Sequence, residues 1–370
     1  MLPPEARLGQ VEALIEQESY FVLHAPRQVG KTTSVRAMAE RLTREGRYTA
    51  LWMTCESAQA AGDDVEAGIA AVLQDLSERG RALPAELQPP PLAEFAGVAP
   101  LSRLYVYLHR WAERSPRPLV LFFDEIDALL GNNLVSVLRQ LRSGFADRPS
   151  GFPQSVALIG LRDVRDYRLE ASRDAPTLGS TSPFNIKIES LTLRDFSAEE
   201  VAALCLQHQE AIGQVFAPRA LARIFELTRG QPWLANALAR QLVEVEVPDP
   251  ATTITEAHVE QAKEKLILRR ATHFDSLAAR LREKRVQRIL APLLAGTFFG
   301  NDVSRDDLQF VVNLGLVRRV DGYLEISNPI YRELIPRFLS EMLEPIFWSR
   351  DWTSSNQPVG STGWPEAVES

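Results

Sequence analysis

The chain has 370 residues, of which 45% are hydrophobic and 24% are charged, and such a length can bury more than one hydrophobic core. Its formal charge of −7 at pH 7 argues against a protein whose whole surface binds polyanions, although one domain could still carry a basic face. No apolar run approaches the roughly 20 residues of a membrane-spanning helix, and the first residues lack the basic start and apolar core of a signal peptide. We therefore expect a soluble, cytoplasmic protein of two or three compact units.

The two cysteines, Cys55 and Cys205, stand far apart in the sequence. Neither has a second cysteine or a histidine at the spacing of a metal site, and one distant pair does not suggest a disulfide framework. We expect both to be small buried residues.

Residues 21–33 predict a buried strand followed by a phosphate-binding loop. The apolar run at residues 21–23 precedes a loop that ends in Gly30, Lys31 and Thr32. The spacing matches G-x-x-x-x-G-K-[ST], except that Ala25 replaces the first glycine. In such a loop, glycine lets backbone N–H groups face phosphate oxygens, the lysine charge lies against the β- and γ-phosphates, and the hydroxyl ligates Mg²⁺. The predicted cofactor-binding residues are Ala25, Pro26, Arg27, Gln28, Val29, Gly30, Lys31, Thr32 and Thr33.

An alternative is that a strand, a turn and a helix contain Gly-Lys-Thr by coincidence. The predicted strand before the loop and an amphipathic run at residues 34–44 after it favour the phosphate loop instead. The missing first glycine has little consequence if Ala25 keeps a negative φ.

Beyond this helix the chain continues with elements typical of an α/β domain. A second strand is predicted at residues 50–55 and a helix at residues 64–79. Residues 81–100 contain five prolines and indicate a loop over one edge rather than a domain boundary. A further helix is predicted at residues 101–113.

Residues 119–123 (LVLFF) form a strongly hydrophobic run that ends in Asp124 and Glu125. Because parallel strands deliver their carboxyl ends to one edge of a sheet, we expect both acids beside the phosphate loop. There Asp124 would hold Mg²⁺ through water, and Glu125 would polarise the water that attacks the γ-phosphate. The alternative is a helix N-cap, because Asp124, Glu125 and Asp127 sit where a helix dipole favours acidic residues.

After a helix at about residues 134–146, a fourth strand is predicted at residues 155–161 and ends at Arg162. An arginine at this edge could reach the γ-phosphate and report its presence. The alternative is a surface ion pair of Arg162 with Asp163 or Asp166.

A fifth, half-exposed strand is predicted at residues 184–190 from the alternation of polar and apolar side chains. The preceding loop is expected to be flexible. Arg168 and Arg173 near it could serve the nucleotide of a neighbouring subunit, although surface arginines are common.

From Ser197 onward the sequence becomes helical, with helices predicted at residues 198–209, 218–228 and 232–245. Gly230, Gln231 and Pro232 form the turn before the last of these. Proline suits the first turn of a helix, where its missing N–H is not needed. A small helical lid placed here could sense the nucleotide through that turn, and Pro232 is therefore added to the predicted cofactor-binding residues.

The last region has the outline of a winged helix. After a linker at residues 247–253, helices are predicted at 254–268 and 274–281. Helices at 285–294 and 305–314 and a hairpin at 316–326 then complete the outline. The basic residues of this unit are Lys284, Arg285, Arg288, Arg305, Arg318 and Arg319. Acidic neighbours dilute their field, so charge alone does not indicate DNA binding.

These patterns predict an α/β fold in which a doubly wound parallel sheet of about five strands, of the P-loop NTPase type, precedes a helical lid and a winged helix. The expected units are a P-loop ATPase core at residues 1–196, the lid at 197–248, the winged-helix domain at 249–350 and a disordered tail at 351–370.

The motifs APRQVGKTT, LVLFFDEID, VALIGLRD, GQPWLANAL and ISNPIYRELIPRFL together resemble the AAA-like ATPases, specifically the archaeal-type and bacterial branch related to the signal-transducing STAND class. The resemblance covers about residues 5–345. It implies Lys31 and Thr32 on phosphate and magnesium, Asp124 on magnesium, Glu125 as catalytic base and Arg162 as sensor 1. It also implies that Gly230 and Pro232 form the nucleotide sensor of the lid. No lid arginine stands out as a sensor 2, as in STAND-like members.

The predicted function is a slow, Mg²⁺-dependent ATPase that couples its nucleotide state to movement of the lid and the winged helix, with Glu125, Lys31 and Arg162 in catalytic roles. The alternative is an ATP-dependent nucleic-acid-binding protein that uses the winged helix on DNA. A small-molecule kinase fits poorly, because an Asp-Glu pair suits activation of water. Beyond ATP and Mg²⁺, the partners left open are a nucleotide-dependent homo-oligomer, an unidentified protein and nucleic acid; no membrane is expected.

Overall fold

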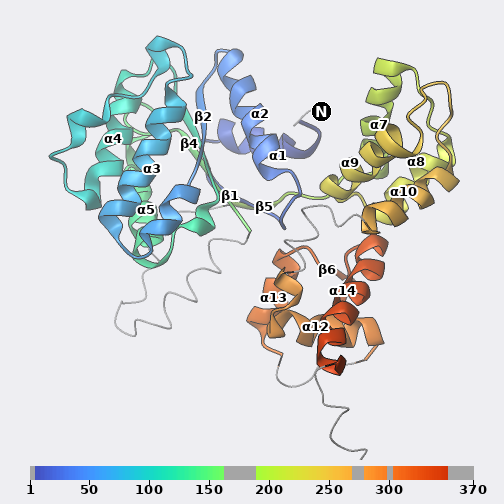
Figure 1. The fold of residues 1–370 in the computed structure, drawn as a ribbon. Coiled ribbons are helices and arrows are strands. Elements are labelled where there is room, and N and C mark those ends of the chain that lie inside the picture. The colour runs from blue at the N-terminus through green and yellow to red at the C-terminus, as the bar shows by residue number, and fades with distance from the viewer. Residues whose placement is uncertain (1–4, 162–188, 269–278, 298–302, 349–370) are drawn as a thin grey trace, which may run out of the picture.

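The computed structural model describes residues 5–161, 189–268, 279–297 and 303–348. At its centre lies a five-stranded sheet with the order β2-β3-β4-β1-β5, in which neighbouring strands run parallel. Figure 1 shows this sheet with its helices on one side of the molecule, the helices α7 to α10 on the other side, and α12 to α14 beneath them. The predicted parallel α/β sheet is confirmed.

The five predicted strands all have counterparts in the sheet. They are β1 (Tyr20–His24), β2 (Thr49–Thr54), β3 (Leu119–Asp124), β4 (Ser155–Gly160) and β5 (Glu189–Thr192). Residues 184–188 of the fifth predicted strand lie outside the described residues. The apolar runs predicted the strands well because all residues of β3 and β4 are buried, as is typical of a parallel sheet covered on both faces.

Alternate residues of each strand face opposite helical layers. In β1, Phe21 and Leu23 pack against α1 (Glu5–Glu16) and α2 (Lys31–Arg44), whereas Tyr20 and Val22 pack against the other layer. That layer consists of α3 (Val65–Gly80), α4 (Pro100–Arg114) and α5 (Gly131–Ser143). The phosphate loop therefore lies where β1 ends and α2 begins, between two packed faces.

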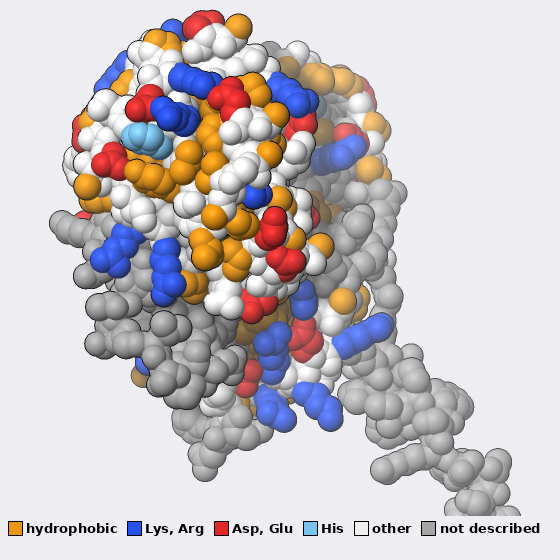
Figure 2. All heavy atoms as spheres, turned by 90° about the vertical axis from the view of Figure 1, so that its left-hand side faces the viewer, with side chains coloured by type: hydrophobic (Ala, Val, Ile, Leu, Met, Phe, Trp, Pro, Cys, Tyr) orange, Lys and Arg blue, Asp and Glu red, His pale blue; other side chains and the backbone are white. Residues whose placement is uncertain are grey.

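The proline-rich segment at residues 81–100 lies over the α3–α5 layer, as predicted for a covering loop. It contains two short 3-10 helices, Ala85–Leu87 and Leu92–Phe95, and buries Phe95. The indole nitrogen of Trp111 in α4 donates to the Leu87 carbonyl at 3.0 Å. Figure 2, viewed from the side of this layer, shows acidic and basic side chains interspersed with hydrophobic ones rather than a patch of one sign.

The helical lid follows β5 and begins with a capping box, in which the Ser197 side chain and the Glu200 side chain each accept the other residue's backbone N–H. Its helices are α7 (Ala198–Ile212), α8 (Pro218–Thr228) and α9 (Pro232–Gln241). A π-helical turn at Leu242–Glu246 ends α9. The next helix, α10 (Glu256–Leu268), packs against α8 and α9 and also contacts α14.

The C-terminal unit has the helix, helix and hairpin order of a winged helix. Its elements are α12 (Lys284–Ala295), α13 (Arg305–Asn313), β6 (Val317–Val320), β7 (Tyr323–Ile326) and α14 (Pro329–Trp348). Asp321 and Gly322 join the two antiparallel strands, and both have positive φ, as a tight hairpin turn requires.

The lid and the C-terminal unit share one hydrophobic core. Ile224 and Leu238 of the lid belong to the same buried cluster as Ile289 and Ile330 of the C-terminal unit. The expected domain boundary near residue 248 therefore crosses a continuous core. Among the described residues, no helix is both long and apolar enough to cross a membrane.

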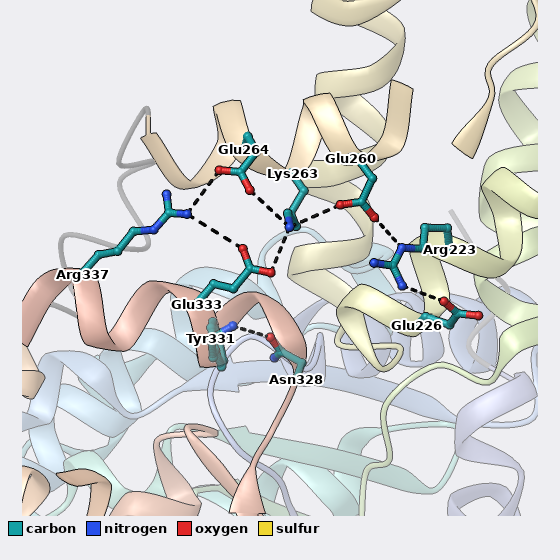
Figure 3. A network of polar contacts seen from close by, with 9 residues as sticks. All are labelled: Arg223, Glu226, Glu260, Lys263, Glu264, Asn328, Tyr331, Glu333 and Arg337. Atoms are coloured by element: carbon teal, nitrogen blue, oxygen red, sulfur yellow. Dashed lines mark hydrogen bonds and ion pairs between the residues drawn. The ribbon is translucent and has the colours of Figure 1, made fainter. Parts of the chain in front are cut away.

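A network of charged side chains joins α10 to α14 (Figure 3). The Lys263 ammonium group lies 2.9 Å from Glu333 of α14, 3.2 Å from Glu264 and 3.3 Å from Glu260. Its side chain is 8% exposed, whereas its three partners are 37–46% exposed. Lys263 thus places a nearly buried cation among three carboxylates at the junction of the two units.

Replacing this cation should destabilise the junction. In Lys263→Ala the three carboxylates lose their shared partner, and we expect the free energy of unfolding to fall by about 1–3 kcal/mol, measured by urea denaturation. Arg240→Ala is the control, because Arg240 and its partner Glu244 are 75% and 55% exposed; its effect should stay within about 0.5 kcal/mol. Equal stability of the Lys263 and Arg240 variants would contradict a structural role for the network.

Candidate functional site

The loop between β1 and α2 has the backbone conformation of an anion-binding loop. Gln28 has φ 62° and Gly30 has φ 85°, and left-handed residues in a tight loop let successive N–H groups converge on a shared point. Ala25, which stands where the motif has its first glycine, is not among the residues with positive φ. Its N–H donates to the Gly160 carbonyl at 3.3 Å, so Ala25 continues the β1–β4 ladder and the glycine is not needed there.

Lys31 begins α2 and turns back toward its own loop. Its ammonium group donates to the carbonyls of Ala25 at 2.7 Å and Pro26 at 2.9 Å. Burial lowers the pKa of Lys31 to about 8, although Asp124 and Asp127 act in the opposite direction. If the Lys31 ammonium group turned to a phosphate, it would exchange two neutral carbonyl acceptors for an anionic one, which forms a stronger hydrogen bond.

The sheet brings Thr32 and Asp124 together, as the sequence predicted. The Thr32 hydroxyl donates to Asp124 Oδ2 at 2.6 Å, and the Trp52 indole nitrogen donates to the same oxygen at 3.1 Å. The backbone N–H of Glu125 donates to Oδ1 at 2.9 Å. The Asp124 side chain is only 2% exposed, so a buried carboxylate is held by three donors beside the phosphate loop.

Glu125 follows at the sheet edge with φ 52°, an unusual conformation for a residue other than glycine that often marks functional sites. Partial burial raises the pKa of Glu125, and the nearby carboxylates of Glu56 and Asp124 add to the effect. The 3-10 turn Ile126–Ala128 that follows has no side-chain cap, and the Asp127 carboxylate instead accepts the N–H of Leu161 at 3.2 Å. No acidic side chain therefore caps this turn, although Asp127 lies in its first turn, as the helix-cap alternative expected.

The lid reaches the phosphate loop through the predicted turn, but by a residue that the sequence analysis did not single out. Gln231 caps α9 by accepting the N–H of Leu234 at 2.6 Å, and its side-chain nitrogen donates to the Gln28 carbonyl at 3.5 Å. Gly230 has φ 77°, and a Cβ there would lie 1.9 Å from the Phe196 carbonyl. Pro232 occupies the first turn of α9, as predicted. The sequence signal for this contact residue was a glutamine directly before the proline that starts α9.

The C-terminal unit also meets the phosphate loop. A Cβ built on Gly315, between α13 and β6, would lie 3.2 Å from the Pro26 side chain. Around this contact lies a cavity of about 260 Å³ lined by residues of the loop, the lid turn and the C-terminal unit. These lining residues include Pro26, Arg27, Val29, Gln231, Asn313, Arg318 and Asn328.

Arg7 of α1 is a second contact that the sequence analysis missed. Its guanidinium donates to the Val29 carbonyl at 2.9 Å and to the Arg194 carbonyl, and it lies 4.9 Å from the centre of the Phe196 ring. Burial lowers its pKa to about 10, opposed by Glu200 and Asp195. Arg7 thereby joins the phosphate loop to the segment between β5 and the lid.

Three predicted residues fall outside the described part of the chain. Arg162, expected at the end of the fourth strand, is one of them, and Arg168 and Arg173 are the others. Their proposed roles therefore stay predictions.

Comparison with known proteins agrees with this geometry. Residues 5–148 match the family model described as AAA ATPase domain, and no curated protein sequence matches the chain. A Walker-type ATPase of Pyrococcus abyssi superposes with a TM-score of 0.59 at 13% identity, covering 91% of this chain and 96% of that one. The ORC2 protein of Aeropyrum pernix, solved as ADPNP–ADP complexes, superposes with a TM-score of 0.51 at 15% identity, covering 94% and 97%.

At these identities the structural likeness shows a shared fold, which extends over nearly the whole of each compared chain. The family match covers the phosphate loop, Asp124 and Glu125, and it includes the strands β1 and β3 that position them. Residues 5–148 therefore form an AAA-like P-loop ATPase domain.

Proposed function

We propose that the protein is a nucleotide-dependent switch, which binds ATP with Mg²⁺, hydrolyses it slowly and changes the position of the lid and winged helix as the γ-phosphate comes and goes. The observation that carries this proposal is the cavity beside the phosphate loop, because the loop, the lid turn and the C-terminal unit all line it. The phosphate loop contacts both the lid turn and the C-terminal unit at this cavity, so a shift of the loop there would act on both units.

In this proposal the loop from Ala25 to Thr33 holds the phosphates, with its N–H groups and the Lys31 ammonium as donors. Thr32 would ligate the magnesium ion, and Asp124 would hold it through a water molecule. Their oxygens are 2.6 Å apart, and oxygen ligands suit this cation. No cluster of three or more acidic, cysteine or histidine side chains among the described residues could hold a metal alone. Phosphate oxygens and water would complete the shell, as is usual for Mg²⁺ in nucleotide sites.

Glu125 is the proposed general base. A carboxylate whose pKa is raised by partial burial and by neighbouring carboxylates accepts a proton from the attacking water more readily than an unperturbed one. Bound magnesium would neutralise charge on the phosphates. Arg162 remains the proposed γ-phosphate sensor, and Arg168 or Arg173 the proposed contacts to a neighbouring subunit.

The coupling step begins at Lys31. In the described arrangement its ammonium holds the carbonyls of Ala25 and Pro26, and Pro26 is the residue against which Gly315 packs. A γ-phosphate that competes for the ammonium frees these carbonyls, so the loop that touches the C-terminal unit can shift. The differential contact of Lys31 in the two states is what biases the equilibrium.

The lid and the C-terminal unit would respond together. They share one core, and the Lys263 network joins α10 to α14. The Gln231 contact to Gln28 gives the lid a direct connection to the same loop. We therefore propose that both units move as one body relative to the sheet.

The alternative use of the winged helix on nucleic acid has less support. The Arg318 guanidinium donates to Glu325 at 2.6 Å, so it is engaged within the chain. Arg305 and Arg319 are exposed and would remain as phosphate contacts. A strongly salt-dependent DNA affinity would reverse this preference. A nucleotide-dependent homo-oligomer or another protein in the cytoplasm remains the proposed target.

Replacing the proposed base should separate binding from turnover. In Glu125→Gln we expect ATP affinity within about threefold of wild type, because the amide keeps the shape, and hydrolysis reduced about 100-fold or more. Glu56→Gln is the comparison variant: it removes one carboxylate that raises the pKa of Glu125 but keeps the proposed base, so its hydrolysis rate should fall far less. Wild-type phosphate release by Glu125→Gln would remove Glu125 from this role.

The Lys31 pKa predicts how affinity depends on pH. Because burial lowers this pKa to about 8, the ammonium is charged below pH 8 and loses its proton as the pH rises further. Calorimetry from about pH 7 to about pH 9.5 should show ATP affinity that is highest near neutrality and falls by up to about tenfold per pH unit above 8. Lys31→Arg stays charged and should show no such decline; a flat wild-type profile would argue against the assignment.

The coupling should be visible as hydrogen exchange. We expect the backbone N–H groups around Gly230–Gln231 and Leu314–Gly315 to exchange at different rates with ADP and with a non-hydrolysable ATP analogue, since both turns contact the phosphate loop. Amides of Leu119 and Val120, at the buried start of β3 and away from Asp124, serve as the internal control. Identical exchange at both turns in the two nucleotide states would mean that the loop does not transmit the γ-phosphate.

A further inference from the structure

We propose that Trp52 is a positioning residue for magnesium binding, acting through the carboxylate of Asp124. This inference rests on the proposed function and extends it to a residue outside the recognised motifs. Trp52 lies in β2, whereas the phosphate loop follows β1 and Asp124 ends β3. Its indole nitrogen donates to Asp124 Oδ2 at 3.1 Å, the same oxygen that accepts the Thr32 hydroxyl at 2.6 Å.

The Asp124 carboxylate has few acceptor positions left. An ionised carboxylate offers about four lone-pair positions. Thr32 and Trp52 use two on Oδ2, and the Glu125 N–H uses one on Oδ1 at 2.9 Å. Since Asp124 is 2% exposed, water has little access to replace a lost donor. The remaining position on Oδ1 is the one left for a magnesium-bound water.

The indole N–H suits this task because it only donates and cannot ligate a cation. The indole N–H takes the second acceptor position of Asp124 Oδ2. Of the two hydrogen-bonded oxygens, Thr32 Oγ1 and Asp124 Oδ2, only the hydroxyl oxygen then keeps lone pairs for a metal. Metal ligands are commonly oriented by hydrogen bonds from residues that do not touch the metal, and Trp52 would orient Asp124 in this way. Loss of such a partner typically costs about 10–100-fold in metal affinity or activity.

The indole itself is held firmly. The guanidinium carbons of Arg36 in α2 and Arg79 in α3 lie 5.1 Å and 3.9 Å from the centre of its ring. Arg79 is fixed in turn by Asp75, whose carboxylate accepts its Nε at 2.6 Å and the backbone N–H of Thr54 at 2.8 Å. Cation–π contacts with these two guanidinium groups explain the position of the ring. They do not require the N–H to meet Asp124, so the two roles can be separated.

Trp52→Phe separates the two roles, because it keeps an aromatic ring beside Arg36 and Arg79 and removes the N–H. Trp111→Phe is the matched control: its indole donates to a backbone carbonyl, that of Leu87 at 3.0 Å, far along the chain from the loop. For each protein, calorimetry would give the affinity for a non-hydrolysable ATP analogue in EDTA and across a Mg²⁺ titration. Thermal unfolding would report stability.

We expect Trp52→Phe to bind the analogue in EDTA as wild type does, and to need about tenfold or more Mg²⁺ for half of the magnesium-dependent gain in affinity. Trp111→Phe should keep the wild-type Mg²⁺ dependence even where its stability falls. A Trp52→Phe titration that overlays the wild-type curve, with only the melting temperature lowered, would overturn the positioning role. Absence of any magnesium effect in wild type would instead overturn the proposed function.

A second measurement does not depend on the folding of that variant. In protein labelled with ¹⁵N-tryptophan, one indole N–H resonance should shift in Asp124→Asn, and the same resonance should shift when Mg²⁺ is added to the wild-type nucleotide complex. The Trp111 resonance should stay in place in both cases. If no single indole resonance responds to both changes, Trp52 does not sense magnesium through Asp124 and the inference is wrong.

Discussion

The short contact between Thr32 and Asp124 depends on the parallel order of the sheet. The rest of the site depends on this contact. Thr32 follows β1 and Asp124 ends β3, and these two strands are not neighbours, because β4 lies between them. Only parallel strands bring both carboxyl ends to the same edge, where the hydroxyl and the carboxylate meet at 2.6 Å. Lys31 and Glu125 are the sequence neighbours of Thr32 and Asp124. The Thr32–Asp124 contact therefore also determines where the Lys31 ammonium and the Glu125 carboxylate lie.

The phosphate loop has two roles in this structure. Its carbonyls at Ala25 and Pro26 receive the Lys31 ammonium, and its outer surface contacts α1, the lid turn and the C-terminal unit through Arg7, Gln231 and Gly315. A ligand that takes the lysine away from the carbonyls therefore acts on a segment that three other parts of the chain hold. The shared core of the lid and the C-terminal unit makes a joint response the simplest one.

Much of this could be predicted from the sequence because the strands are buried on both faces. Continuous apolar runs predicted β3 and β4 to within a residue, and the motif spacing predicted that Thr32 and Asp124 would meet. The contacts of Trp52 and Arg7 could not be predicted, since they depend on which strands are neighbours and on how α1 packs. Pro232 was singled out for its place in the helix, whereas the adjacent Gln231 makes the contact to the loop.

The most direct test of the central claim is a crystal structure with a non-hydrolysable ATP analogue and Mg²⁺. The account predicts that the Lys31 ammonium has left the carbonyls of Ala25 and Pro26 for a phosphate oxygen, with the cation between the phosphates and the Thr32–Asp124 pair. A triphosphate bound elsewhere, or a lysine still hydrogen-bonded to both carbonyls beside an occupied loop, would contradict it.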